Sequence, residues 1–139
     1  MKLQDSVIAI TGGGQGLGRA MAEYLAAKGA RLALIDLMED KLAEAAEACK
    51  LAGGDAKTYV CNVAKEEDVE TTFQAIINDF GHLNGLVNNA GILRDGLMVK
   101  FKDGKLEKRM ELAQWQSVID VNLTGVFLCG REAATRMIE

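Results

Sequence analysis

Residues 7–18, VIAITGGGQGLG, join a short apolar run to a cluster of glycines and then to a helical pattern. The run Val7–Ile10 is continuous and brief, which is typical of a buried parallel strand. From Leu17 to Lys28 the apolar residues recur on one helical face, and Gly29 ends the helix. In such a strand–loop–helix junction, backbone N–H groups and the positive end of the helix can meet a phosphate, because glycine has no Cβ to block it.

The alternation of strand and helix repeats along the rest of the chain. The expected strands and helices alternate four times, which predicts right-handed parallel crossovers. The sequence therefore predicts an α/β fold with a Rossmann-type doubly wound parallel sheet in a single domain, residues 1–139. The further strands expected are Arg31–Asp36, Thr58–Cys61 and 85–87, and the further helices are about 39–52, Val69–Phe80 with an apolar stripe capped by Gly81, and about Ala113 to the chain end.

Composition excludes several classes of protein. With 49% hydrophobic and 26% charged residues, the composition is that of an ordinary globular domain. The net charge of −4 lacks the basic excess that is typical of nucleic-acid-binding proteins. No apolar run approaches the ~20 residues that cross a membrane, and no secretory signal is visible, so we expect a cytoplasmic protein. The three cysteines are far apart, and the chain has a single histidine, His82, so we expect buried structural thiols and no metal site.

The ligand of the glycine loop has three candidates at this point. The spacing from Gly13 to Gly18 nearly fits a nucleotide-hydrolysing P-loop, but Arg19-Ala20 follows where Lys and Ser or Thr are needed. Glycines at 12, 14 and 16 also suit a methyltransferase that uses S-adenosylmethionine. The third candidate is a dinucleotide.

Asp36 favours the dinucleotide, and NAD over NADP. It ends the second strand, 18 residues beyond Gly18, where a carboxylate accepts hydrogen bonds from a ribose diol. Two unit charges ~4 Å apart in an effective dielectric of ~20 interact by about 4 kcal/mol, so a 2′-phosphate would be repelled there. No arginine precedes Gly16 or follows Asp36 to offset this repulsion.

Three motifs resemble the short-chain dehydrogenase/reductase family. They are the glycine signature within Thr11–Gly18, the turn Asn88–Gly91 after the fourth strand, and Asn122 within the run 120–125, DVNLTG. The resemblance covers essentially the whole chain and implies that Asn122 is the family's catalytic asparagine, which locally breaks its helix. Asn122 also shares a helical face with Val118 and Val126, so we expect a buried, hydrogen-bonded side chain.

The resemblance also implies a set of cofactor-binding residues. Asn62-Val63 follows the third strand where the family usually has Asp-Val, and its amide oxygen can still accept from adenine. Asn84 likewise replaces the family's common aspartate before the fourth strand. The expected set is Gly12, Gly14, Gln15, Gly16, Leu17, Gly18, Asp36, Leu37, Asn62, Val63, Asn89, Ala90 and Gly91.

The family's serine and its Tyr-x-x-x-Lys pair follow the asparagine, but the 17 residues after Asn122 contain none of these types. Tyr24 and Lys28 have the right spacing on the first helix, which runs away from the nicotinamide. We interpret Tyr24 as a core contact and Lys28 as a partner of the helix dipole, so the pair is not catalytic. We therefore expect this chain to be inactive alone and to be the N-terminal part of a three-layer α/β/α enzyme.

The sequence indicates the substrate and the partners less directly than the cofactor. Residues 92–98 resemble the corresponding loop of 3-oxoacyl-[acyl-carrier-protein] reductases, which implies a small-molecule or carrier-protein-bound acyl thioester. An extra basic segment, Lys100–Arg109, carries a local charge of +3 and a hairpin signal at Asp103-Gly104, and could dock an acidic carrier. The family's last helix here often joins a contact between subunits, so we expect a homotetramer. The alternatives are a non-catalytic dinucleotide-binding module and, remotely, a methyltransferase.

Overall fold

A parallel sheet of four strands organises the chain, whose computed structural model describes residues 1–139. The strands are β1 (Val7–Thr11), β2 (Arg31–Asp36), β3 (Asp55–Val60) and β4 (Gly85–Val87), in the order β3-β2-β1-β4. All neighbours are parallel, with Ile8 opposite Leu32 on one side and Gly85 on the other. The chain therefore reverses its direction of winding between β1 and β4, where ligands bind in such sheets.

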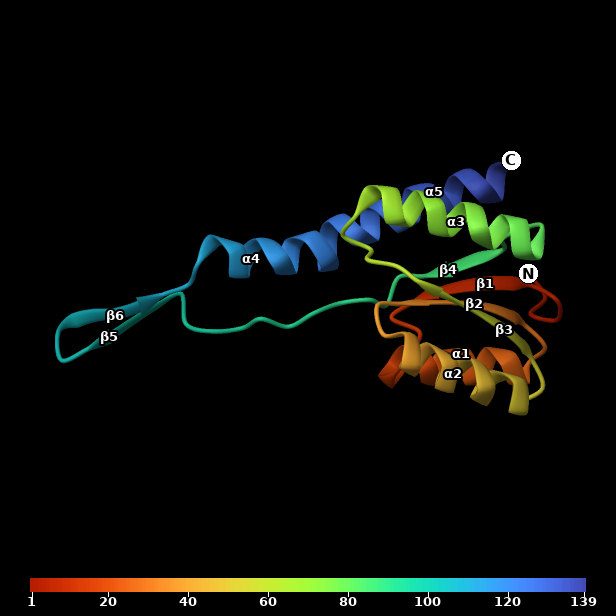
Figure 1. Ribbon diagram of the computed structural model, residues 1–139, viewed down its shortest axis with the longest axis horizontal. Helices are drawn as coiled ribbons and strands as arrows, with labels where there is room; N and C mark the ends of the chain where they lie inside the picture. The colour runs from red at the N-terminus through yellow and green to blue at the C-terminus, as the bar shows by residue number, and fades with distance from the viewer.

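Helices cover both faces of this sheet. Helices α1 (Gly16–Ala27) and α2 (Glu39–Leu51) lie on one face, and α3 (Glu66–Phe80) and α5 (Gly125–Ile138) lie on the other (Figure 1). The doubly wound α/β fold is thus confirmed. The stripe on α3 is confirmed as well, because Val69, Phe73 and Ile76 are buried and Gly81 ends the helix with a φ of 84°.

The apolar face of α1 was predicted correctly only in part, because Met21 and Leu25 pack against the core but Leu17 and Tyr24 do not. Its buried residues are Gly18, Ala22 and Ala26, whereas Leu17 and Tyr24 are 70% and 61% exposed. The small residues recur every four positions and let the helix lie close to the sheet, which outweighs the burial of larger side chains on another face. Tyr24 is therefore not a core contact. The Lys28 ammonium instead lies over the Tyr24 ring, with Nζ 5.5 Å from the ring centroid.

The last helical region is divided into three. Helix α4 (Leu112–Ile119) passes into a π-helical turn, η1 (Asp120–Thr124), and then into α5. The packed side chains of α5 include Leu128, Cys129 and Ala133, whereas Trp115 and Phe127 are 57% and 61% exposed. These two large apolar side chains are thus uncovered in the chain. The expectation that the side chain of Asn122 is buried is also wrong, since Asn122 is exposed.

A two-stranded hairpin projects from the body beyond α4 (Figure 1). Strands β5 (Val99–Lys102) and β6 (Lys105–Arg109) pair antiparallel, as the Asp103-Gly104 signal predicts. Both turn residues have positive φ, 51° and 72°, which matches the twist of the flanking strands. Every residue of the two strands is exposed.

Cys49, Cys61 and Cys129 are free and buried, which confirms that they are structural thiols. Burial raises the pKa of Cys49 to about 11 and that of Cys129 to about 12, so both stay protonated at neutral pH. No cluster of three or more His, Cys, Asp or Glu side chains is arranged to hold a metal ion. None of the helices has both the length and the apolar character that a membrane span requires.

Candidate cofactor site

A pocket of about 350 Å³ opens at the carboxyl ends of the parallel strands. The ends of β1 and β2 and the segments that follow β3 and β4 all contribute to it, as expected at the point where a doubly wound sheet changes direction. Its lining is Gly12, Gln15, Ile35, Asp36, Leu37, Met38, Cys61, Asn62, Val63, Asn89, Ala90, Gly91, Ile92 and Val121.

The glycine loop fits closely against the turn that follows β4. A Cβ atom at Gly18 would overlap the carbonyl oxygen of Gly12 and would lie 2.6 Å from Asn89 Nδ2. Gly12 has a φ of 66°, in the left-handed region that favours glycine. These two glycines therefore let α1 begin directly against the loop, with its N-terminal end beside the pocket.

Asp36 is oriented by backbone donors at the end of β2. Its Oδ2 accepts a hydrogen bond from Gly14 N at 3.1 Å, and its Oδ1 accepts from Leu37 N at 2.7 Å. A Cβ atom at Gly14 would lie only 3.0 Å from Asp36 Oδ2, so the glycine lets the carboxylate approach the loop. The side chain thus presents a fixed negative charge at the pocket, at the place where the sequence predicts a ribose contact.

Thr11 joins the glycine loop to the segment after β4. Its buried Oγ1 accepts hydrogen bonds from the backbone N–H groups of Asn89 and Ala90, each at 3.0 Å. In return, Asn89 Nδ2 donates to the carbonyl oxygens of Thr11 and Gly12, each at 3.2 Å. Two walls of the pocket that are nearly 80 residues apart in sequence are therefore held in one geometry.

Asn122 holds the far end of the same segment. Its Oδ1 accepts from Ile92 N at 2.8 Å, and its Nδ2 donates to Ile92 O at 2.9 Å. It lies within η1, where Gly125 N bonds to Asp120 O across the widened turn. Insertion of one residue into a helix in this way often marks a functional site. The helix is thus locally broken at Asn122, as the resemblance implies.

Asn62 and Cys61 line the pocket after β3. Asn62 Oδ1 already accepts from Ala64 N at 3.0 Å, so one acceptor direction of the amide oxygen is used within the turn. Burial raises the pKa of the Cys61 thiol, which keeps it protonated and unsuited to act as a nucleophile. No serine, tyrosine, lysine or histidine lines the pocket.

Most of the residues predicted from the sequence meet in this pocket. Gly14, Gly16, Leu17 and Gly18 do not line it, and Asn122 touches it through Ile92. Leu17 instead lines a separate apolar hollow on α1 together with Met21, Tyr24 and Leu25. The apolar lining residues Ile35, Met38, Cys61, Ile92 and Val121 were not predicted to bind the cofactor. The first three lie at or beside strand ends, Ile92 follows the turn after β4, and Val121 comes from η1.

Comparisons with known proteins identify the family to which the chain is similar. The family model described as short chain dehydrogenase matches residues 6–139. The chain is 37% identical over 138 residues to a 3-oxoacyl-[acyl-carrier-protein] reductase of Synechocystis, covering 99% of this chain and 52% of that protein. It is also 37% identical to a 2,5-dichloro-2,5-cyclohexadiene-1,4-diol dehydrogenase of Sphingobium indicum, covering 99% of this chain and 50% of that protein.

Solved structures show the same likeness. The crystal structure of an NAD⁺-bound xylitol dehydrogenase superposes with a TM-score of 0.83 at 30% sequence identity, covering 99% of this chain and 50% of that one. The chain therefore spans about half the length of the curated relatives and solved structures that it matches.

Proposed function

The chain belongs to the short-chain dehydrogenase family, and we propose that it forms the NAD-binding part of an oxidoreductase that interconverts a carbonyl and a secondary alcohol. A 3-oxoacyl or 3-hydroxyacyl thioester is the proposed substrate, supported by the name of the Synechocystis relative and the loop 92–98. The nearby diol dehydrogenase supports the reaction class rather than the acyl group. The methyltransferase alternative has no support among these relatives.

The single observation that carries the choice of NAD is the orientation of Asp36. Backbone donors hold its carboxylate at the edge of the pocket beside Gly14. A fixed carboxylate accepts hydrogen bonds from the two hydroxyls of an adenosine ribose and repels a 2′-phosphate. The glycine loop provides the backbone approach for a pyrophosphate, and Asn62 and Val63 flank the proposed adenine position.

The bound nicotinamide would supply the hydride, and the residues of this chain would bind and orient it. Thr11 and Asn89 fix the glycine loop against the segment after β4. Asn122 fixes Ile92 at the end of that segment and is the one residue here that we propose as catalytic. No serine, tyrosine, lysine or histidine lines the pocket, so we propose that the chain alone does not turn over substrate.

Binding of NADH and NADPH to the chain and to its Asp36→Asn variant tests the proposal. The unchanged chain is expected to bind NADH at least about tenfold more tightly than NADPH, because the carboxylate favours the diol and repels the phosphate. Asp36→Asn removes the charge but keeps the side-chain shape, so this preference is expected to disappear. Isothermal calorimetry measures both dissociation constants.

A matched control is Asp40→Asn, an exposed carboxylate in the first turn of α2 that does not line the pocket. It is expected to leave the ratio of the two dissociation constants unchanged. Tighter binding of NADPH by the unchanged chain would contradict the assignment of Asp36. Failure of the chain to bind either nicotinamide cofactor would contradict the proposed function as a whole.

The hairpin supports a carrier protein as the partner that delivers the substrate. Its register places Lys100 opposite Lys108 and Lys102 opposite Lys105, so four lysines share one face. Like charges directly opposite each other destabilise a sheet, and an isolated hairpin is at best marginally stable. One ion pair, between Lys100 and Glu107 at 3.1 Å, offsets this repulsion. We therefore propose that this lysine face docks a carboxylate-rich surface of the carrier.

Replacing Lys102 and Lys105 with glutamine is expected to weaken binding of an acidic acyl carrier protein about three- to tenfold. The pair lies directly beside the turn, so both positive charges leave the lysine face together. The control is the double variant Lys28→Gln/Lys50→Gln, which removes one exposed lysine directly after α1 and one in α2. Calorimetry at low and high salt compares them, and equal losses in both variants would contradict docking at the hairpin.

The proposed assembly is a homotetramer in the cytoplasm. Exposed apolar side chains on α4 and α5, among them Trp115 and Phe127, support a contact between subunits along this helical region. The three buried free thiols fit a reducing compartment. Light scattering on the whole protein measures the oligomeric state, and a monomer at micromolar concentration would contradict the tetramer.

A further inference from the structure

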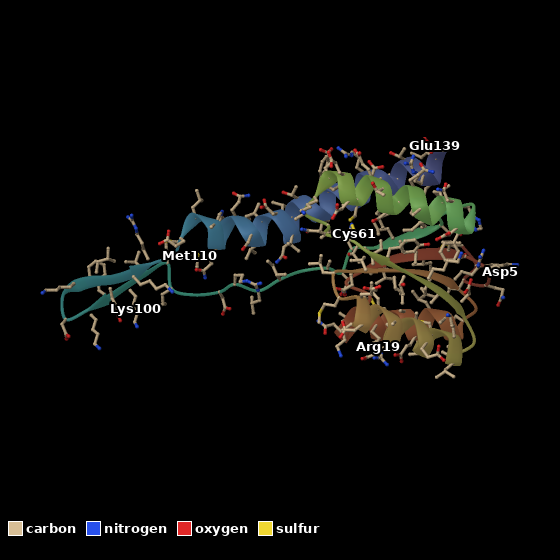
Figure 2. All side chains as sticks on the ribbon, in the orientation of Figure 1. Asp5, Arg19, Cys61, Lys100, Met110 and Glu139 are labelled. Atoms are coloured by element: carbon tan, nitrogen blue, oxygen red, sulfur yellow. The ribbon has the colours of Figure 1, made fainter.

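One cation, Lys41, begins beside the carboxylate that selects the cofactor, and a second, Arg19, lies on the neighbouring helix α1. A Cβ atom at Gly14 would lie 3.0 Å from Asp36 Oδ2 and 3.1 Å from Lys41 Cβ, so the stem of Lys41 begins next to the proposed ribose position. Arg19 is the fourth residue of α1, on the side of the sheet that α1 and α2 share (Figure 2). Either cation could attract a 2′-phosphate and so oppose the discrimination by Asp36.

One carboxylate engages both of these cations. Glu44 Oε2 lies 3.5 Å from Lys41 Nζ and 3.7 Å from Arg19 Nη1. Arg19 is also held by Glu23, with 2.8 Å between Nε and Oε1. Glu44 follows Lys41 by one turn of α2, so the helix itself presents the acid to the lysine, while the arginine comes from the neighbouring helix α1.

From this geometry we infer that Glu44 is a second determinant of cofactor choice, acting through Lys41 and Arg19. It holds the two cations in ion pairs and compensates their charge, so that they do not offset the repulsion of a 2′-phosphate by Asp36. Glu44 does not line the pocket and is a positioning residue. The inference rests on the proposed use of NAD and adds to it a residue that no cofactor-binding motif contains.

The test compares Glu44→Gln with Glu47→Gln in the chain. Both variants remove one exposed carboxylate from α2, but no ion pair is formed by Glu47. Glu44→Gln is expected to tighten NADPH binding about fivefold at low salt, because Lys41 then has no ion pair and can meet the phosphate, whereas Arg19 keeps its ion pair with Glu23. NADH binding is expected to change less than twofold in either variant, and Glu47→Gln is expected to leave NADPH binding unchanged.

A second variant separates the two cations from a general change in charge. Adding Lys41→Met to Glu44→Gln is expected to remove most of the gain in NADPH affinity, and 0.5 M salt is expected to reduce it. Equal NADPH affinities of Glu44→Gln and Glu47→Gln would overturn the inference while the unchanged chain still prefers NADH. If the unchanged chain binds neither cofactor, the proposed function itself fails, so the two failures are distinguishable.

Discussion

Gly18→Ala is expected to destabilise the chain by at least about 4 kcal/mol and to abolish NADH binding. The added methyl would overlap the carbonyl oxygen of Gly12 and approach Asn89 Nδ2 to 2.6 Å. Backbone cannot yield as a flexible side chain can, so α1 must move away from the glycine loop. This movement would also break the hydrogen bond between Asn89 Nδ2 and Gly12 O.

Gly130→Ala is the matched control for this substitution. Gly130 lies inside α5, and its added Cβ would lie 3.9 Å from Asn88 Nδ2, an ordinary contact distance. Alanine is favoured over glycine inside a helix by about 1 kcal/mol, so this variant is expected to be slightly stabilised. Urea denaturation followed by circular dichroism measures both changes. A loss below about 1 kcal/mol for Gly18→Ala would contradict the close approach.

The sequence predicted the sheet well because its signals are local. The short apolar runs of β1 and β2 end in glycine or aspartate, and the period of α3 is strict over Val69–Phe80. The turn at Asp103-Gly104 needs two residues with positive φ, and Asp-Gly is one of the residue pairs that favour this conformation. Each of these elements is determined mainly by its own residues.

The errors arose where burial depends on distant parts of the chain. Helical periodicity placed Leu17 and Tyr24 on an apolar face, but it could not tell that Gly18, Ala22 and Ala26 form the face that meets the sheet. Asn122 shares the pattern of a buried position, yet its amide is satisfied at the surface by Ile92, 30 residues earlier. Contacts of this kind depend on how distant segments pack together in the fold, and the periodicity of one helix does not contain that information.

The apolar lining of the pocket had no sequence signal for the same reason. Ile35 and Cys61 lie beside the ends of β2 and β3, and any apolar residue there would line the pocket. Glu44 was also missed, since its proposed role depends on an arginine of another helix. The polar and glycine residues were predicted because phosphate and ribose restrict the residue types that can bind them.

Thr11→Val tests whether one buried hydroxyl holds the two walls of the pocket together. The substitution keeps the branched shape of the side chain but removes the acceptor used by the backbone N–H groups of Asn89 and Ala90. An unpaired donor that is removed from water costs about 1–3 kcal/mol, so the loss of both bonds is expected to cost about 2–4 kcal/mol in unfolding free energy. NADH binding is expected to weaken about tenfold or more, because the segment after β4 loses its position against the glycine loop.

Thr58→Val distinguishes this effect from the exchange of a hydroxyl for a methyl in general. Thr58 lies on β3 with an exposed side chain, where valine is an equally good strand residue, so its stability is expected to change by less than about 0.5 kcal/mol. If Thr11→Val resembled this control, the hydrogen bonds between Asn89 Nδ2 and the carbonyl oxygens of Thr11 and Gly12 would be sufficient to hold the walls. Those bonds use the backbone of residue 11 and survive the substitution. A loss of stability and of NADH affinity in Thr11→Val alone therefore assigns the joining of the walls to the hydroxyl itself.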